Sequence, residues 1–161
     1  MGAGKSTVGA VVADRLGMEF VDLDRWIERD AKMSVAEIFA LEGEDGFRRR
    51  EVTALREVLA SVQPSVIAAG GGIVTSQEAR SLLGTVDEVV LLEVSAEVAA
   101  QRLAGNGTRP LLHDDARATL AQLKEARDLA YREVATHQVG VDGLTPGETA
   151  DAVLEIVGST P

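Results

Sequence analysis

Apolar residues follow two different spacings along this chain. Short segments are almost continuously apolar, which is typical of buried strands, and they alternate with longer segments in which apolar residues recur every three or four positions, as in amphipathic helices. Strands are predicted at 19–24, 65–72, 86–94 and 137–143, and helices at 5–17, 34–43, 45–62, 75–84, 95–105, 118–135 and 145–158. Strands that alternate with helices predict a three-layer α/β/α fold, in which helices cover both faces of a parallel sheet.

Local sequence signals mark the starts of two of these helices. Ser34 and Glu37 have the spacing of a capping box. Thr145 and Glu148 have the same spacing, and Pro146 follows Thr145 at the first helical position, where proline is favoured. Both helices are therefore expected to begin at defined residues.

The composition fits one domain that covers residues 1–161. Hydrophobic residues make up 45% of the chain and charged residues 26%, as in ordinary globular proteins. The net charge of −10 disfavours a nucleic-acid partner, because phosphate backbones reward a basic surface. No apolar run approaches the roughly 20 residues of a membrane helix. Cysteine is absent, and we expect a cytoplasmic monomer without a membrane partner.

The stretch MGAGKST precedes the first predicted helix. Gly4, Lys5 and Ser6 match the last three positions of the phosphate-binding pattern G-x-x-x-x-G-K-[ST]. In such a loop, backbone N–H groups at a helix start hold phosphate oxygens, the lysine reaches the β- and γ-phosphates, and the hydroxyl binds Mg²⁺. The first glycine of the pattern would lie two positions before Met1, so a glycine-rich start without this function is the alternative.

Two acidic residues end the first predicted strand. Strand alternation would place Asp22 and Asp24 on the same side, at the edge of a parallel sheet where ligands bind. One carboxylate could serve a hydrated Mg²⁺ while the other orients a substrate hydroxyl. A strand-end turn in which Asp24 caps a helix is the alternative.

Arginines and glycines form further candidate sites. Three consecutive arginines at 48–50 point in different directions on a helix, so periodicity does not decide which of them faces a ligand; a solvated run of charges is the alternative. The glycines at 70–72 end a strand, where a ligand can approach the main chain closely; a loose turn is the alternative. Arg109 lies in a breaker-rich segment at about 105–115, which we expect to form a lid, and Arg127 follows on the next helix. An ordinary surface position is the alternative for both arginines.

The order of these motifs resembles that of shikimate kinases. The chain carries GAGKST near its start, D-x-D after about one helix, F-R-R-x-E, a triple glycine after a strand, R-P-L-L and a later A-R-x-x-x-Y. The resemblance covers nearly the whole chain. It implies a P-loop kinase of the nucleoside-monophosphate-kinase type with a five-stranded parallel sheet. It also implies that ATP and shikimate react, with Mg²⁺, to give ADP and shikimate 3-phosphate in aromatic amino-acid biosynthesis.

The same resemblance implies which residues take part in phosphoryl transfer. Lys5 would contact the transferring phosphate, Asp24 would hold and activate the shikimate hydroxyl, and Arg109 would face the γ-phosphate from the lid. Mg²⁺ would be bound by Ser6 and, through water, by Asp22.

Binding residues are implied in the same way. Arg102 and Pro146 would lie on the two sides of adenine, whereas Arg48 and Arg127 would bind the shikimate carboxylate. The substrate would lie in a helical region at about 24–55. The residues implied in nucleotide binding are Gly2, Ala3, Gly4, Lys5, Ser6, Thr7, Arg102, Arg109 and Pro146. The residues implied in shikimate binding are Asp24, Arg48, Gly70, Gly71, Gly72 and Arg127.

The chain departs from the family at its start. The family's loop begins two residues before Met1, after a strand in the middle of the sheet. Without that strand, a central position in the sheet must be open, be filled by another segment or be closed by rearrangement. Buried unpaired backbone groups beside it would cost about 1–3 kcal/mol each. We therefore expect that the natural chain starts upstream of Met1.

Two other functions stay open on the sequence alone. One is a related small-molecule P-loop kinase, such as a gluconate kinase. The other is a non-catalytic relative that binds shikimate or a nucleotide. Because the lysine, the aspartate and the three arginines expected at the site are all present, a shikimate kinase is the favoured interpretation.

Overall fold

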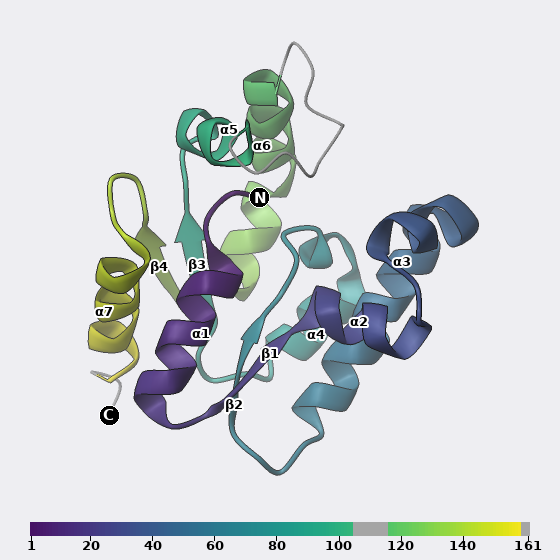
Figure 1. Cartoon of the computed structure of the whole chain (residues 1–161), viewed down its shortest axis with the longest axis horizontal. Helices are drawn as coiled ribbons and strands as arrows, with labels where there is room; N and C mark the ends of the chain where they lie inside the picture. Colours follow the sequence, from purple (N-terminus) through teal and green to yellow (C-terminus); the bar gives the residue numbers. More distant parts are fainter. Residues whose placement is uncertain (105–115, 159–161) are drawn as a thin grey trace.

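The computed structural model describes residues 1–104 and 116–158. Figure 1 shows how its helices and strands are arranged. The helices are α1 (Lys5–Leu16), α2 (Leu23–Ala31), α3 (Val35–Leu59), α4 (Gln77–Leu83), α5 (Ala96–Ala104), α6 (Ala116–Val134) and α7 (Pro146–Val157), with a short 3₁₀ helix η1 (Ile73–Thr75). The strands are β1 (Glu19–Asp22), β2 (Ser65–Ala68), β3 (Val90–Glu93) and β4 (His137–Gly140). None of the helices in these ranges is long and apolar enough to cross a membrane.

The four predicted strands are all confirmed, and each one pairs in parallel. β1 pairs with β2, with Glu19 opposite Ser65. β3 pairs with β4, with Val90 opposite His137. The strands form two separate two-stranded sheets, because β2 and β3 do not pair with each other. The parallel α/β class is therefore as predicted, but the sheet is divided.

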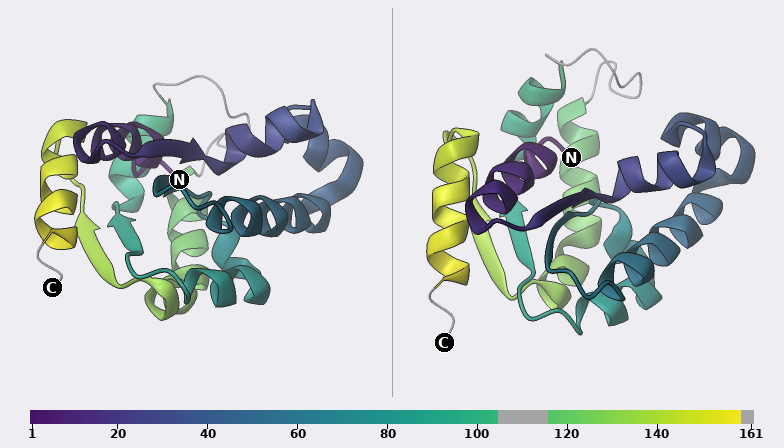
Figure 2. Two further views of the ribbon diagram at one scale, coloured as in Figure 1. Left: turned by 90° about the horizontal axis from the view of Figure 1, so that it is seen from below. Right: turned by 60° about the horizontal axis from the view of Figure 1, so that its bottom comes forward.

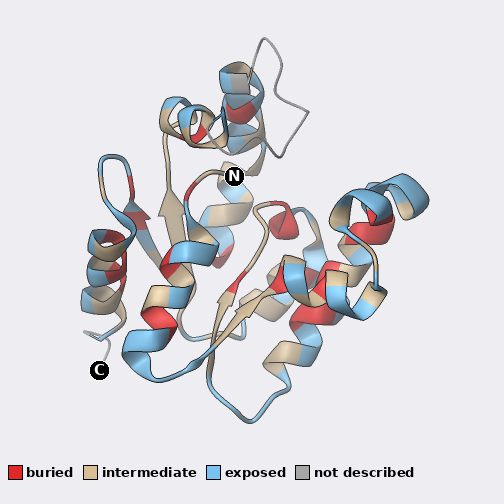
Figure 3. Cartoon of the chain, in the orientation of Figure 1, coloured by how far each residue is buried: buried red, intermediate tan, exposed pale blue. Residues whose placement is uncertain are grey.

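Helices cover both faces of the strands. α1 packs against α7 on one face, and α4 contacts both α3 and α6 on the other (Figure 2). Buried residues form two cores, as the colouring in Figure 3 indicates. One core surrounds Leu23, Ile38 and Leu55, and the other includes Val12 and Val153. These aliphatic side chains are removed from water by packing between the layers, which stabilises the three-layer arrangement.

The helix signals read from the sequence are largely confirmed. The Glu37 carboxylate accepts a hydrogen bond from the Ser34 backbone N–H at 2.7 Å, and the Glu148 carboxylate accepts one from the Thr145 N–H at 2.8 Å. Both capping boxes are therefore formed. The predicted boundary at Gly43 is a sharp kink inside α3, where glycine has φ 71° and ψ −174°.

The sequence analysis missed helix α2. Its first turn is capped by Asp22, whose carboxylate accepts a hydrogen bond from the Arg25 N–H at 3.3 Å. Leu23 and Ile27, four positions apart, are both fully buried against α3 and its neighbours. The sequence analysis placed a strand over 19–24, whereas β1 ends at Asp22, which caps the first turn of α2.

A large cavity separates the two sheets. It has a volume of about 860 Å³ and is lined by the whole of β2 and the whole of β3. Of the three arrangements expected at the centre of the sheet, the structure therefore has the open one.

Candidate active site

The chain start forms a glycine-rich loop against helix α1. Gly2 and Gly4 both have left-handed backbones, with φ of 73° and 83°, and Ala3 between them is buried. Gly4 is the N-cap of α1 and supplies no side-chain hydrogen bond to the first turn. Alternating left-handed glycines and an uncapped helix start aim backbone N–H groups at one point, which suits a phosphate. A Cβ at Gly2 would also lie 2.9 Å from the Ala99 Cα, so this position requires glycine.

Arg102 holds this loop beside the strand β4. Its guanidinium donates to the Gly2 carbonyl at 3.2 Å and to the Val141 carbonyl at 3.0 Å. The linker from β4 to α7, residues 141–145, therefore lies next to the glycine-rich loop at Val141, and Pro146 follows it as the first residue of α7. Arg102 thus has a structural contact that the sequence analysis did not foresee, and its place beside adenine stays a prediction.

Ser6 and Asp22 meet at the start of α1. The Ser6 hydroxyl donates to the Asp22 carboxylate at 2.5 Å, although the residues are 16 positions apart. This contact brings together the two residues expected at a magnesium ion. Among residues 1–104 and 116–158, no cluster of three or more His, Cys, Asp or Glu side chains could hold a metal by itself. A Mg²⁺ here would take further ligands from water and phosphate, as is usual for this ion.

Asp24 lies on a different element from the one that the sequence analysis predicted. The strand ends at Asp22, and Asp24 lies in the first turn of α2. Strand alternation therefore does not relate the two carboxylates, and that argument is wrong. The Asp24 carboxylate instead lies beside Gly70, where an added Cβ would be 3.4 Å from Oδ1.

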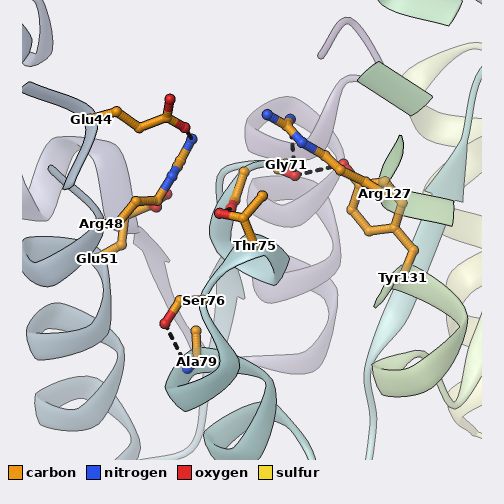
Figure 4. Close-up of polar contacts among 10 residues, drawn as sticks. Glu44, Arg48, Glu51, Gly71, Thr75, Ser76, Ala79, Arg127 and Tyr131 are labelled. Atoms are coloured by element: carbon orange, nitrogen blue, oxygen red, sulfur yellow. Dashed lines mark hydrogen bonds and ion pairs between the residues drawn. The ribbon is translucent and has the colours of Figure 1, made fainter. Parts of the chain in front are cut away.

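Side chains from helices α2, α3 and α6 lie against the triple glycine after β2. A Cβ at Gly70 would lie 2.9 Å from the Glu51 carboxylate, and one at Gly72 would overlap the Arg48 guanidinium. The Gly71 carbonyl accepts a hydrogen bond from the Tyr131 hydroxyl at 2.6 Å and a longer one from Arg127 at 3.4 Å. Figure 4 shows Arg48 and Arg127 on opposite sides of this loop. The glycines are therefore needed for close packing and do not form a loose turn.

Two carboxylates fix the Arg48 guanidinium. Nη1 donates to Glu51 at 2.5 Å and Nη2 donates to Glu44 at 2.9 Å. Burial alone would lower the pKa of Arg48, but these hydrogen bonds outweigh it and the pKa is raised. Within the described residues, the Nε of Arg48 is buried without a hydrogen-bond partner, so the guanidinium has donor capacity that the two glutamates do not use.

The structure distinguishes Arg48 from the arginines that follow it. Arg49 is exposed, and Arg50 binds Glu42 through Nε and Nη2 at 2.7–3.2 Å. Of the three consecutive arginines, Arg48 alone lies against Gly72. Periodicity could not make this choice.

Glu51 was not singled out from the sequence, although it lies in the F-R-R-x-E motif. It is 1% exposed, and burial raises its pKa while the hydrogen bond from Arg48 opposes that shift. The charge of Asp24 raises the pKa further and that of Arg127 lowers it, so all four groups lie within electrostatic reach of one another. The spacing of three positions between Arg48 and Glu51 on one helix, which allows an ion pair, is the sequence signal that could have identified it.

Tyr131 was missed as well. It lies one helical turn after Arg127 on α6, and both side chains reach the same carbonyl. The spacing of four residues in A-R-x-x-x-Y was available in the sequence as the signal for a shared helix face. Arg109 and the predicted lid at 105–115 lie outside the described residues.

A family model described as "Shikimate kinase" matches residues 1–157. The chain belongs to the shikimate kinase family. It is 43% identical over 159 residues to a shikimate kinase of Marinomonas sp. (strain MWYL1), which covers 98% of this chain and 87% of that relative. It is also 43% identical over 146 residues to a shikimate kinase of Francisella tularensis subsp. novicida, with 90% of this chain and 83% of that one covered.

Solved structures of the family have the same fold. The shikimate kinase of Acinetobacter baumannii in complex with shikimate superposes with a TM-score of 0.92 at 38% identity, over 99% of this chain and 89% of the other. The enzyme of Aquifex aeolicus gives a TM-score of 0.83 at 28% identity, over 98% of this chain and 92% of the other. The α/β fold and the enzyme class expected from the motifs are thereby confirmed.

Proposed function

We propose that this chain transfers the γ-phosphoryl group of ATP to the 3-hydroxyl of shikimate, giving ADP and shikimate 3-phosphate. The observation that carries the proposal is the convergence of Asp24, Arg48 and Arg127 on the glycine loop after β2, next to the phosphate loop. A Cβ at Gly71 would lie only 3.8 Å from the Met1 backbone nitrogen, so the two loops adjoin. A carboxylate and two guanidinium groups beside a phosphate site suit a phosphoryl acceptor that carries both a hydroxyl group and a carboxylate.

The nucleotide half of the site is the stretch Gly2–Thr7 with Arg102 and the β4–α7 linker. The N–H groups of the loop and the start of α1 would hold the β-phosphate, and Lys5 would neutralise charge on the transferring group. Ser6 and Asp22 fit a Mg²⁺ because this ion prefers oxygen ligands, and the hydroxyl and carboxylate oxygens of these residues already lie 2.5 Å apart. When bound, the ion would neutralise charge on the phosphates.

The acceptor half is built around two arginines. Arg48 and Arg127 would bind the shikimate carboxylate as bidentate or paired donors, which fixes the ring and hence the position of its 3-hydroxyl. Glu51 and Glu44 restrict the Arg48 side chain, and the Gly71 carbonyl contributes to holding Arg127. Binding a carboxylate locally in this way is compatible with a protein whose net charge is −10.

Asp24 is the proposed proton acceptor. The shikimate 3-hydroxyl oxygen would attack the γ-phosphorus as the bond to the β-phosphate oxygen breaks, and the hydroxyl proton would pass to the Asp24 carboxylate. Lys5 and the backbone N–H groups would stabilise the charge that develops on the leaving group. Arg109 as a lid residue, a monomeric state and a cytoplasmic location stay predictions.

The test is ADP release from Mg-ATP by this chain with shikimate, with gluconate and with neither, together with ³¹P NMR of the product. We expect ADP release that depends on shikimate and a new phosphomonoester signal. Equal release in all three mixtures, or a preference for gluconate, would contradict the proposal. Shikimate binding by calorimetry without any turnover would instead indicate a non-catalytic binding protein.

A further inference from the structure

One carbonyl group of the glycine loop at 70–72 accepts hydrogen bonds from two side chains of helix α6. The Tyr131 hydroxyl donates to the Gly71 carbonyl at 2.6 Å, whereas Nη1 of Arg127 donates to the same oxygen at 3.4 Å. The first distance lies within the normal range of about 2.5–3.0 Å for O–H···O bonds, and the second exceeds the range of about 2.7–3.2 Å for N–H···O bonds. The carbonyl therefore takes its strong hydrogen bond from the tyrosine and only a weak one from the arginine.

Two features allow the Tyr131 hydroxyl to reach this carbonyl. The side chain of Tyr131 packs against the core that contains Ile73 and Val74, which fixes the direction of the ring. The second feature is the lack of a side chain at Gly71, where an added Cβ would lie 3.0 Å from the hydroxyl oxygen. The bond between Tyr131 and the loop thus depends on glycine at position 71.

Helix α6 is joined at a second point to the segment that follows the glycine loop. Glu133, two positions after Tyr131, forms an ion pair at 3.0 Å with Arg80 of α4. Arg80 also donates through Nη1 to the Val74 carbonyl at 2.7 Å. These contacts hold the backbone of α6 in place beside the loop. When Arg127 turns toward a ligand, its side chain must therefore move while the helix stays where it is.

A weakly held guanidinium suits a residue that has to bind a ligand. Within residues 1–104 and 116–158, the long contact to Gly71 is the only hydrogen bond of the Arg127 guanidinium, which has five N–H donors in all. Without the tyrosine hydroxyl, the part-buried Gly71 carbonyl would lose its strong donor, and an acceptor left in that state is costly. Arg127 is the donor beside it, so its guanidinium would be drawn onto the carbonyl and away from a ligand.

We propose that Tyr131 is a positioning residue for the acceptor carboxylate. Its hydroxyl satisfies the Gly71 carbonyl, so that the Arg127 guanidinium is only weakly held there and stays available to the carboxylate. The inference rests on the proposed function, in which Arg127 binds the carboxylate of shikimate. Tyr131 itself does not touch the substrate in this account and acts through Arg127.

The test compares the Kd of shikimate with that of its neutral carboxamide by isothermal titration. We expect Tyr131→Phe to raise the Kd of shikimate about fivefold or more and that of the carboxamide by less than about twofold, because the charged ligand gains most from a guanidinium. In steady-state kinetics, the KM for shikimate should rise more than kcat falls. In an Arg127→Gln background, Tyr131→Phe should have no further effect on the Kd of shikimate.

Thr136→Val is the matched control. It removes a hydroxyl that donates to the Val89 carbonyl at 3.2 Å, just after the end of α6 and outside the glycine loop. Both Kd values should stay within about twofold of those of the wild type, as for a substitution that touches neither ligand nor loop.

Three results with Tyr131→Phe would overturn the proposal. They are an unchanged Kd for shikimate, an equal loss of affinity for both ligands, and the same effect with and without Arg127. If the wild type binds no shikimate, the proposed function fails, and a crystal structure of ligand-free Tyr131→Phe then tests this inference by itself. We expect Nη1 of Arg127 to approach the Gly71 carbonyl to a normal hydrogen-bond distance, and an unchanged distance would contradict the inference.

If Tyr131→Phe does not fold, a crystal structure of the wild type with shikimate provides the second measurement. We expect the Tyr131 hydroxyl to remain on the Gly71 carbonyl while the Arg127 guanidinium binds the shikimate carboxylate and leaves that carbonyl. An arginine that stays on the carbonyl, or a tyrosine that leaves it, would contradict the proposal.

Discussion

The guanidinium of Arg48 lies directly over the Cα of Gly72, in the space that a Cβ at that position would occupy. This relationship joins helix α3 to the loop after β2 and fixes where a carboxylate could be bound. It also explains why the chain has a third consecutive glycine at a place where its backbone φ of −87° does not itself require one.

The substitution Gly72→Ala should therefore weaken shikimate binding by moving the Arg48 guanidinium. The added methyl group must displace the guanidinium, and we expect the KM for shikimate to rise about tenfold or more, with a smaller change in kcat. Steady-state kinetics with varied shikimate and saturating ATP give both values. Gly140→Ala is the matched control, because a Cβ there meets no atom within 4 Å. An unchanged KM in Gly72→Ala would show that Arg48 does not bind the acceptor.

The single substitutions Arg48→Lys and Arg49→Lys distinguish the contributions of two neighbouring arginines to shikimate binding. Arg48 donates through both terminal nitrogens to Glu51 and Glu44, whereas Arg49 is exposed. A lysine cannot reproduce the planar fork, so we expect Arg48→Lys to weaken shikimate binding about tenfold or more and Arg49→Lys to leave it within twofold. Isothermal titration with shikimate measures both. Equal effects at the two positions would contradict the assignment of Arg48.

Glu51 should make stability depend on pH in a defined direction. Burial raises its pKa in the folded protein above the ordinary value of 4.5, so the folded state binds this proton more tightly than the unfolded chain. Its contribution is most favourable below pH 4.5 and is lost as the pH rises through the raised pKa. The free energy of unfolding of the wild type, minus that of Glu51→Gln, should therefore fall from about pH 4 to about pH 7.

Urea denaturation at a series of pH values measures this difference. Glu44→Gln is the control, since it removes the exposed carboxylate from the same guanidinium. Because Glu44→Gln keeps the Glu51 carboxylate, the contribution of Glu51 cancels in the difference in free energy of unfolding between the wild type and that variant. A difference for Glu51→Gln that rises with pH would mean that the ion pair with Arg48 outweighs burial.

Much of the fold could be predicted because its signals are local. The two capping boxes and the kink at Gly43 each depend on a few adjacent residues. Helix α2 was missed because its capping residue, Asp22, also ends a strand, and only packing against α3 decides between the two roles.

The sequence supplies candidate residues for the site, but it does not supply their arrangement in space. The choice of Arg48 over Arg49, the burial of Glu51 and the hydrogen bond from Tyr131 to Gly71 all depend on contacts between distant segments. Periodicity within one helix carries no information about such contacts. The division of the sheet between β2 and β3 could be expected only as one of three arrangements.

The most direct test of the central claim is Asp24→Asn. If Asp24 accepts the hydroxyl proton, shikimate-dependent ADP release should fall about 100-fold or more. The Kd for shikimate should stay within a few-fold, because Arg48 and Arg127 are unchanged. Asp14→Asn, on the exposed face of α1, should behave as the wild type in both measurements. A variant Asp24→Asn that releases ADP at the wild-type rate would contradict the account.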